Sequence, residues 1–332
     1  MIDTIYVESA IRQHHRVESL LRRYPKARVI ECTKYQEIFN RRKQNFRVQK
    51  ARPALILAEK SNPLLYSVPG EQHLGAAHNY YFSHLLNCPF DCRYCFLQGM
   101  FTSANYVLFV NYEAFVDGIA DTCARHTSPI HFFSGYDCDS LALEPLTGFA
   151  AHFIEAIAGF DNAVLELRTK STQIRSLLAR APHDRCVVAM SLAPNVIAQN
   201  LEHGAPSLAD RLGALRRLQE HGWPIGLRFD PILPLHDGVA IYERFFAAVF
   251  NELDAAGVHS ATLGSLRLPR SFAKRLFRLY PEEPLFASSY EELDGTFVFG
   301  GPSDVNFLMT VRDNLSRYMP CERIFTQHDT TK

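Results

Sequence analysis

Three cysteines lie close together in the sequence, at Cys88, Cys92 and Cys95, in the spacing C-x3-C-x2-C. Three thiolates on one short loop can ligate three irons of a cubane cluster, which leaves the fourth iron without a protein ligand. That open position allows the amino and carboxylate groups of S-adenosylmethionine to chelate the cluster. An electron passed to the sulfonium then cleaves it to a 5′-deoxyadenosyl radical. The spacing therefore predicts a [4Fe–4S] cluster that initiates radical chemistry.

A structural zinc site is the alternative interpretation of these cysteines, with a histidine such as His84 as the fourth ligand. Zinc sites usually pair C-x2-C with a second pair of ligands, and the sequence has no second pair at a suitable spacing. For most of the other cysteines, a small buried apolar side chain is the simpler interpretation. These cysteines are Cys32, Cys123, Cys138, Cys186 and Cys321.

From residue 81 onward, short β-branched and aromatic runs alternate with longer segments of helical periodicity. The expected strands are Tyr81–Leu86, Tyr106–Val110, Ile130–Phe133, Ala163–Leu167, Val187–Ser191, Ile225–Phe229 and Ala261–Leu266. The expected helices are Tyr112–Arg125, Pro145–Phe160, Thr172–Ala181, Ser207–His221 and Val239–Ala256. Such alternation requires parallel strands joined by right-handed crossovers. About six βα units are visible, which predicts an α/β fold with a partial (β/α)6 barrel; a doubly wound open sheet is the alternative.

Polar residues stand at the ends of four of these strands. Tyr136 and Cys138 follow the strand at Ile130–Phe133, and Lys170 follows the next strand, whereas Ser191 and Asp230 end two later ones. Loops at the carboxyl ends of barrel strands form active sites, and the three cysteines also follow a strand. We therefore expect one cavity, in which Lys170 suits a cofactor carboxylate and Ser191 and Asp230 suit groups of the adenosyl moiety.

The two ends of the chain do not share this alternation. Residues 1–75 mix short strands and helices, including Thr4–Glu8, Ile11–Tyr24 and Arg28–Cys32. After residue 280, a hairpin-like stretch at Thr296–Gly301 precedes a helix at Val305–Tyr318 and a strand at Arg323–Thr326. We therefore expect an N-terminal extension (1–75), the partial barrel (76–280) and a C-terminal extension (281–332).

The charge balance limits the kinds of partner. The chain has 35 Lys plus Arg and 35 Asp plus Glu, so any nucleic acid would be bound by a local basic patch rather than by a global field. The basic run Arg41-Arg42-Lys43 is open to two interpretations, a phosphate contact or a solvated helix face. No signal peptide and no stretch of about 20 apolar residues is visible, which predicts a cytoplasmic protein without a membrane span.

From about residue 80 to its end, with gaps, the sequence resembles the spore photoproduct lyase family of radical S-adenosylmethionine enzymes. The matching segments are Cys92-Arg93-Tyr94-Cys95-Phe96-Leu97-Gln98, Leu143-Glu144-Pro145-Leu146-Thr147-Gly148, Arg168-Thr169-Lys170, Glu202-His203-Gly204-Ala205-Pro206-Ser207, Trp223-Pro224-Ile225-Gly226, and Arg267-Leu268-Pro269-Arg270-Ser271-Phe272-Ala273-Lys274-Arg275. The radical motif is shared by a large superfamily, and the flanking segments make the match narrower.

The resemblance implies roles for several residues. Cys88, Cys92 and Cys95 match the cluster ligands, whereas Lys170 and Ser191 match positions that hold S-adenosylmethionine. Tyr94 matches a tyrosine that lies near the cofactor and has a hydrogen-relay role. The family acts on a thymine photoproduct in DNA, which makes DNA carrying that lesion the expected partner, together with a reductant such as flavodoxin or ferredoxin.

The sequence departs from the family at three places. The cysteine that donates a hydrogen atom to the thymine radical corresponds to Tyr136, and Cys138 stands where the family has a cofactor-contacting serine, so either residue is a candidate donor. The family's second tyrosine is Phe96. The family's DNA-wedging hairpin is basic, but residues 289–299 are acidic and carry no Lys or Arg. Because phosphate contacts supply much of DNA affinity, this hairpin should bind duplex poorly.

Three hypotheses follow. The first is reversal of the thymine photoproduct, with the product radical quenched by Cys138 or Tyr136. The second keeps the radical chemistry but changes the substrate to a small molecule, a nucleotide or a peptide, with no DNA repair. The third is a cluster-bearing binding or sensing protein without turnover.

Overall fold

The computed structural model of the chain describes residues 2–68, 74, 76–300 and 303–326. Its largest sheet has eight strands in the order β18-β14-β13-β11-β10-β9-β5-β4. In that order the strands are Ile324–Thr326, Val258–Ser265, Ile225–Ile232, Cys186–Ser191, Ala163–Thr169, Ile130–Ser134, His78–Phe82 and Tyr66–Ser67. Neighbouring strands are parallel, except that β4 is antiparallel to β5. The sheet thus contains the six parallel strands expected for the βα series, with one strand added at each edge.

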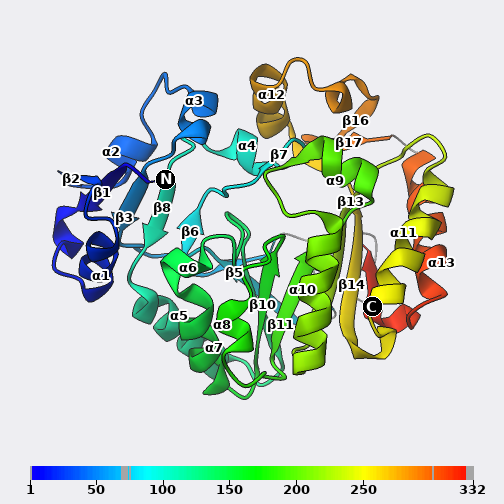
Figure 1. Ribbon diagram of the computed structural model, residues 1–332, viewed down its shortest axis with the longest axis horizontal. Helices are drawn as coiled ribbons and strands as arrows, with labels where there is room; N and C mark the ends of the chain where they lie inside the picture. Colours follow the sequence, from blue (N-terminus) through cyan, green and yellow to red (C-terminus); the bar gives the residue numbers. More distant parts are fainter. Residues whose placement is uncertain (1, 69–73, 75, 301–302, 327–332) are drawn as a thin grey trace.

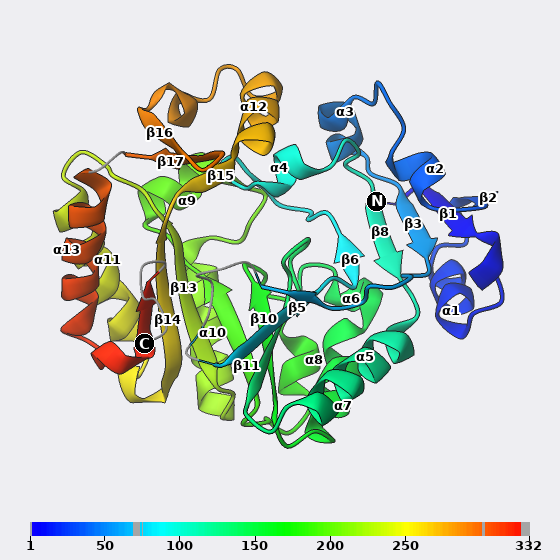
Figure 2. The same cartoon turned by 180° about the vertical axis from the view of Figure 1, so that it is seen from behind.

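The sheet is curled, and helices cover its outer side (Figures 1 and 2). These helices are α5 (Tyr112–Arg125), α6 (Glu144–Thr147), α7 (Phe149–Ala158), α8 (Arg175–Leu178), α10 (Leu208–His221), α11 (Gly238–Glu252) and α13 (Ser303–Ser316). The short helix α9 (Asn195–Leu201) lies instead at the carboxyl-end edge of the sheet (Figure 1). Phe82 of β5 packs against Phe115 of α5 and Phe153 of α7 in the core between sheet and helices. The partial (β/α)6 barrel is therefore confirmed, and the doubly wound open sheet is wrong.

Helix boundaries follow local capping signals. Helix α10 begins with a capping box between Ser207 and Asp210 and ends at Gly222, whose φ of 97° is left-handed. Gly148, with a φ of 59°, divides the single helix expected at Pro145–Phe160 into α6 and α7. The helix expected at Thr172–Ala181 is confined to α8 because its first residues form a turn, in which the Ser171 hydroxyl accepts a hydrogen bond from the backbone of Gln173.

A second sheet packs beside the barrel, with strand order β2-β1-β3-β8-β6. These strands are Arg28–Cys32, Thr4–Glu8, Leu55–Ala58, Tyr106–Phe109 and Leu85–Leu86, and the segment also contains α1 (His15–Arg23), α2 (Gln36–Phe39) and α3 (Phe46–Ala51). The expected strand Tyr81–Leu86 is therefore two strands, because the chain leaves the barrel after Phe82 and enters the second sheet at Leu85. The expected strand Tyr106–Val110 likewise belongs to the second sheet, where β8 pairs with β3 and β6.

The C-terminal part adds a three-stranded sheet, ordered β15-β17-β16 and formed by Arg267–Pro269, Thr296–Phe299 and Tyr290–Leu293. Helix α12 (Arg270–Leu279) lies beside it and packs on α4 (Leu97–Met100). Asp294 and Gly295 have φ values of 47° and 75°, which suits the tight turn of the hairpin. The hairpin is confirmed at Thr296–Phe299, and Gly301 lies outside the described residues. In the described part of the chain no helix is both long and apolar enough to span a membrane.

Candidate active site

The segment that carries the three cysteines crosses between the two sheets. Asn87 begins it in a left-handed conformation, with a φ of 70°. Its buried side-chain amide donates hydrogen bonds to the carbonyls of Ser103 and Asn105, at 2.8 and 2.7 Å. Its backbone N–H donates to the carbonyl of Asp137 at 2.9 Å. The start of the segment is therefore fixed to both the second sheet and the barrel.

Two further contacts hold the middle of the segment. Lys50 of α3 donates from Nζ to the carbonyls of Cys88 and Phe90, at 2.5 and 2.8 Å. Asp91 and Cys92 form a short strand, β7, which pairs antiparallel with β12 at Glu202–His203. The backbone carbonyls around the first cysteine thus face a cation, and the second cysteine is tied to the loop between α9 and α10.

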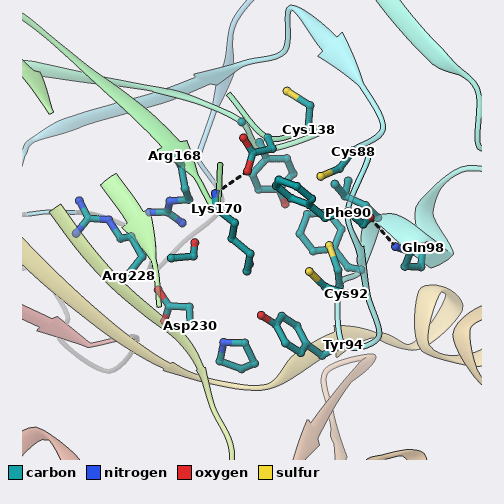
Figure 3. Close-up of a pocket in the computed structure, with 18 of the residues that line it drawn as sticks. Cys88, Phe90, Cys92, Tyr94, Gln98, Cys138, Arg168, Lys170, Arg228 and Asp230 are labelled. Carbon is teal, nitrogen blue, oxygen red and sulfur yellow. Dashed lines mark hydrogen bonds between the residues drawn. The ribbon is translucent and has the colours of Figure 1, made fainter. Parts of the chain in front are cut away.

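Cys88, Cys92 and Cys95 all line one cavity. Figure 3 shows Cys88 and Cys92 on the side opposite Arg228 and Asp230. Burial raises the pKa of Cys92 to about 12 and also raises the pKa of the other two thiols. The thiols are therefore neutral without a ligand, and a bound metal must displace their protons. Among the described residues, no three His, Cys, Asp or Glu side chains could hold one metal ion. A cubane cluster is compatible with this spacing because each thiolate binds a different iron.

His84, the fourth ligand of the zinc interpretation, lies elsewhere. Its ring stacks on Phe149 with 3.6 Å between the centroids, and burial lowers the pKa of His84 to about 3. His84 is absent from the described lining of the cavity. The structure therefore does not bring this histidine to the three cysteines.

Lys170 and Tyr94 meet at a buried ion-pair network. The hydroxyl of Tyr94 donates to Oε1 of Glu202, and Arg211 donates to Oε2 of the same carboxylate. Lys170 Nζ lies 3.9 Å from Oε1 of Glu202 and 5.5 Å from the centroid of the Tyr94 ring. Although burial opposes it, the charges of Lys170 and Arg211 lower the pKa of Glu202, so the carboxylate is ionised. Glu202 thus orients Lys170 and Tyr94, two residues for which the family resemblance implies a role at the cofactor.

Asp139 positions the backbone that carries Lys170. Its Oδ1 accepts hydrogen bonds from the Thr169 hydroxyl and from the backbone of Leu141 and Ala142, at 2.6, 3.0 and 2.8 Å. Its Oδ2 accepts from the backbone N–H of Lys170 at 2.6 Å. One buried carboxylate therefore joins the ends of β9 and β10.

The two candidate hydrogen donors both line the cavity. Tyr136 is stacked on Tyr81, with 4.3 Å between the ring centroids, and lies 5.5 Å from the centroid of Phe96. Cys138 is buried, and burial raises the pKa of its thiol well above the ordinary value, as it raises the pKa of Tyr136. Each residue keeps its proton near neutral pH, and with it a hydrogen atom that can be transferred.

The last two expected residues also line this cavity. Ser191 ends β11, where its carbonyl accepts a hydrogen bond from Arg211 at 2.9 Å. Asp230, in β13, accepts from the Thr262 hydroxyl at 2.5 Å and faces Lys170 across the cavity (Figure 3). The carboxyl ends of the strands therefore bring Lys170, Ser191 and Asp230 together with the three cysteines.

The sequence does not single out the ion pairs between Glu166 and two arginines that line this cavity, Arg168 and Arg228. Arg228 is fully buried and bonds both carboxylate oxygens of Glu166, with Nε–Oε1 at 3.1 Å and a terminal nitrogen to Oε2 at 2.6 Å. Arg168 shares Oε1 at 3.0 Å and extends into the cavity (Figure 3). Alternation along β10 and β13 places these groups on the inner face of the barrel. It does not predict which charged residues pair, because that depends on the register between the strands.

The C-terminal hairpin is exposed along all of β16. Its Glu292 carboxylate lies 3.1 Å from Arg270 of α12. The acidic hairpin expected from the sequence is therefore on the surface.

Comparison with known proteins gives one family. A family model described as spore photoproduct lyase matches residues 76–283. The spore photoproduct lyase of Bacillus subtilis (strain 168) is 27% identical over 172 residues, which cover 51% of this chain and 49% of the relative. The spore photoproduct lyase of Geobacillus sp. (strain Y412MC61) is 23% identical over 258 residues, 71% of this chain and 73% of the relative. The chain thus spans about half the length of the first of these relatives.

Solved structures of spore photoproduct lyase share the fold. One, complexed with dinucleoside spore photoproduct, superposes with a TM-score of 0.84 at 17% identity, covering 99% of this chain and 98% of that chain. A double mutant with bound AdoMet and dinucleoside spore photoproduct also gives a TM-score of 0.84 at 17% identity, with 99% of both chains covered. At this identity the superposition shows a common architecture over nearly the whole chain.

Proposed function

The chain belongs to the spore photoproduct lyase family, and we propose that it is a radical S-adenosylmethionine lyase that reverses a thymine photoproduct in DNA. The observation that carries this proposal is the single cavity lined by Cys88, Cys92, Cys95 and Lys170. The relatives named spore photoproduct lyase, and the solved structures with AdoMet and dinucleoside spore photoproduct, support it.

The donor set fits the two cofactors. Three free thiols would hold a [4Fe–4S] cluster, and Lys170, Ser191 and Asp230 supply a cation, a hydroxyl and a carboxylate for S-adenosylmethionine. When bound, the pair supplies a 5′-deoxyadenosyl radical, which removes a hydrogen atom from the lesion. Lys50 neutralises the partial charge of the carbonyls at Cys88, and Glu202 holds Tyr94 and Lys170 in place.

The hydrogen donor is Cys138 or Tyr136 in this proposal. After the cross-link breaks, the product radical on thymine must receive a hydrogen atom, and both residues are protonated on the cavity wall. If the Cys138 thiol is the donor, a Cys138→Ala variant should leave repair incomplete and yield by-products of the product radical. If the Tyr136 phenol is the donor, a Tyr136→Phe variant should instead show the incomplete repair and the by-products.

The acidic hairpin favours a second candidate, radical chemistry on another substrate such as a small molecule, nucleotide or peptide. Glu291 and Asp294 are exposed with Glu292 on the surface where the family wedges DNA. Acidic side chains repel phosphates, so duplex DNA would gain little affinity there. The proposal also includes three further points: a one-electron donor such as flavodoxin or ferredoxin, a cytoplasmic location, and the division of the chain into three parts at residues 75 and 280.

Anaerobically reconstituted protein tests the proposal. With dithionite and S-adenosylmethionine it should form 5′-deoxyadenosine, and with dinucleotide spore photoproduct it should also form thymidylyl-thymidine. A Cys95→Ala variant should lose bound iron and both products, whereas Cys186→Ala should keep them because Cys186 lies in β11 and not among the described lining residues. 5′-Deoxyadenosine without repair would select the second candidate. An intact cluster without 5′-deoxyadenosine would rule out both.

A further inference from the structure

Positive charge is concentrated in two segments of this electrically neutral chain. Residues 40–52 contain six Lys or Arg and no Asp or Glu, and α12 contains four Lys or Arg and no Asp or Glu. The basic face is defined here by six exposed members of these segments: Arg41, Arg42, Lys43, Arg47, Lys274 and Arg278. Two further exposed members, Arg52 and Arg270, are left out because they pair with Asp3 and Glu292. Figures 1 and 2 show α3 and α12 at one edge of the molecule, on either side of α4.

The charges of the basic face are directed to solvent. In the described part of the chain, the side chains of Arg41, Arg42, Lys43, Lys274 and Arg278 form no ion pair. Arg47 joins the two segments, because its guanidinium donates to the carbonyl of Leu279 at 3.5 Å. The field of the basic face is therefore open to a charged partner.

The helices α3 and α12, which carry Arg47, Lys274 and Arg278 of the basic face, contact the cysteine segment or the helix α4 that follows it. Arg47 precedes Lys50 by about one helical turn, and Lys50 bonds the carbonyls of Cys88 and Phe90. On the other side, Arg275 of α12 donates to the carbonyl of Met100, at the end of α4. The two helices that carry part of the basic face thus each contact this region, α3 at the cysteine segment and α12 at the end of α4.

An apolar side chain stands within this charge. Val48 is 68% exposed, the highest value among the large apolar residues that are exposed in the described structure. An apolar contact surrounded by charge is typical of a protein–protein interface, whereas DNA offers mainly phosphates to such a surface. The composition of the basic face therefore favours a protein partner over duplex DNA.

We propose that the basic face is the docking surface for a small acidic one-electron carrier protein that reduces the cluster. The proposal rests on the function proposed above, since that chemistry requires one electron for each cleavage of S-adenosylmethionine. One electron leaves the reduced carrier, the cluster gains it, and no bond forms or breaks. Docking here shortens the path to the cluster, and opposite charge brings the carrier in at high rate.

Reduced flavodoxin is the probe, mixed anaerobically with reconstituted protein while the cluster absorbance is followed. An Arg41→Glu/Arg42→Glu variant should be reduced about tenfold or more slowly at low ionic strength. The rate for the unmodified protein should fall as salt rises from about 0.01 to 0.15 M, because the screening length shrinks from about 30 to 8 Å. Calorimetric binding of oxidised flavodoxin to the cluster-free protein should weaken in the same variant.

The control reverses two exposed charges elsewhere, Lys26→Glu/Arg217→Glu, and should leave both measurements unchanged. Dithionite needs no docking, so 5′-deoxyadenosine formed with dithionite should be equal in all three proteins. Loss of that product would count against the proposed function and not against the docking surface. Reduction by flavodoxin at the unmodified rate in the Arg41/Arg42 variant overturns the docking proposal. So does weakened duplex binding with unchanged reduction, which would make the face a DNA surface.

Discussion

Replacement of Glu166 by glutamine should destabilise the barrel by about 3 kcal/mol. Burial alone would raise the pKa of Glu166, but the guanidinium groups of Arg228 and Arg168 outweigh it and lower the pKa from 4.5 to about 2. That difference corresponds to about 3 kcal/mol in favour of the charged form. Removing one partner of a buried ion pair typically costs about 3–5 kcal/mol, which agrees. Both Glu166 oxygens accept from guanidinium donors, so an amide nitrogen there would face a like donor.

The assay is unfolding in urea and by heat, with Glu220→Gln as control because that carboxylate is exposed and its pair with Arg216 is 3.9 Å long. For 332 residues the entropy of unfolding is about 0.7 kcal/mol per kelvin, so the midpoint should fall by about 4 °C. A double Glu166→Gln/Arg228→Met variant should lose less than the single variant, since no unpaired charge remains buried.

The lowered pKa of Glu166 also determines how its contribution to the free energy of unfolding depends on pH. A carboxyl with a lowered folded-state pKa stabilises the fold above its unfolded value, here 4.5, and this contribution is lost as pH falls toward about 2. The difference between unmodified protein and Glu166→Gln should therefore be full above pH 5 and shrink below it. A difference under about 0.5 kcal/mol at pH 7, or one that grows on acidification, would refute the reasoning.

Three other changes probe the packing and hydrogen bonds around the cavity. Gly99→Ala should separate α12 from α4 and lower the thermal unfolding midpoint, because a Cβ at residue 99 would lie 2.4 Å from the carbonyl oxygen of Phe272. Circular dichroism measures this midpoint, and an unchanged value would contradict the close packing of the two helices. Lys50→Met should lower the iron retained per chain after anaerobic gel filtration, because the carbonyl of Cys88 loses its cationic donor; full retention contradicts that role. Asp139→Ala should cost about 1–3 kcal/mol in urea unfolding, since four donors lose their acceptor; a cost below about 0.5 kcal/mol contradicts it.

The sequence predicts the barrel and the cavity well because both depend on the order of residues within short segments of the chain. Hydrophobic periodicity locates the parallel strands, and residues at the carboxyl ends of neighbouring strands, such as Lys170 and Ser191, must meet at one edge of the sheet. The capping signals at Ser207 and Gly222 similarly bound α10. These inferences need only spacing and residue type.

Contacts between distant segments are not predicted in this way. Glu202 has no local feature that assigns it to Tyr94, because their contact depends on the pairing of β7 with β12. The transfer of Leu85–Leu86 to the second sheet is similarly hidden, since Tyr81–Leu86 has the pattern of one continuous strand. Lys50 lies within a basic run, and only the tertiary structure distinguishes it from its solvated neighbours.

The place of β18 in the barrel sheet has a consequence for synthesis of the protein. β14 at Val258–Ser265 pairs on one side with β13 and on the other with residues 324–326, which follow almost sixty residues later. While the chain emerges from the ribosome, one edge of β14 stays unpaired during the translation of α12, the hairpin and α13. At about 5–20 residues per second this interval lasts several seconds. An open strand edge is a site for pairing with other chains, so the nascent protein is most exposed to misassembly just before β18 appears.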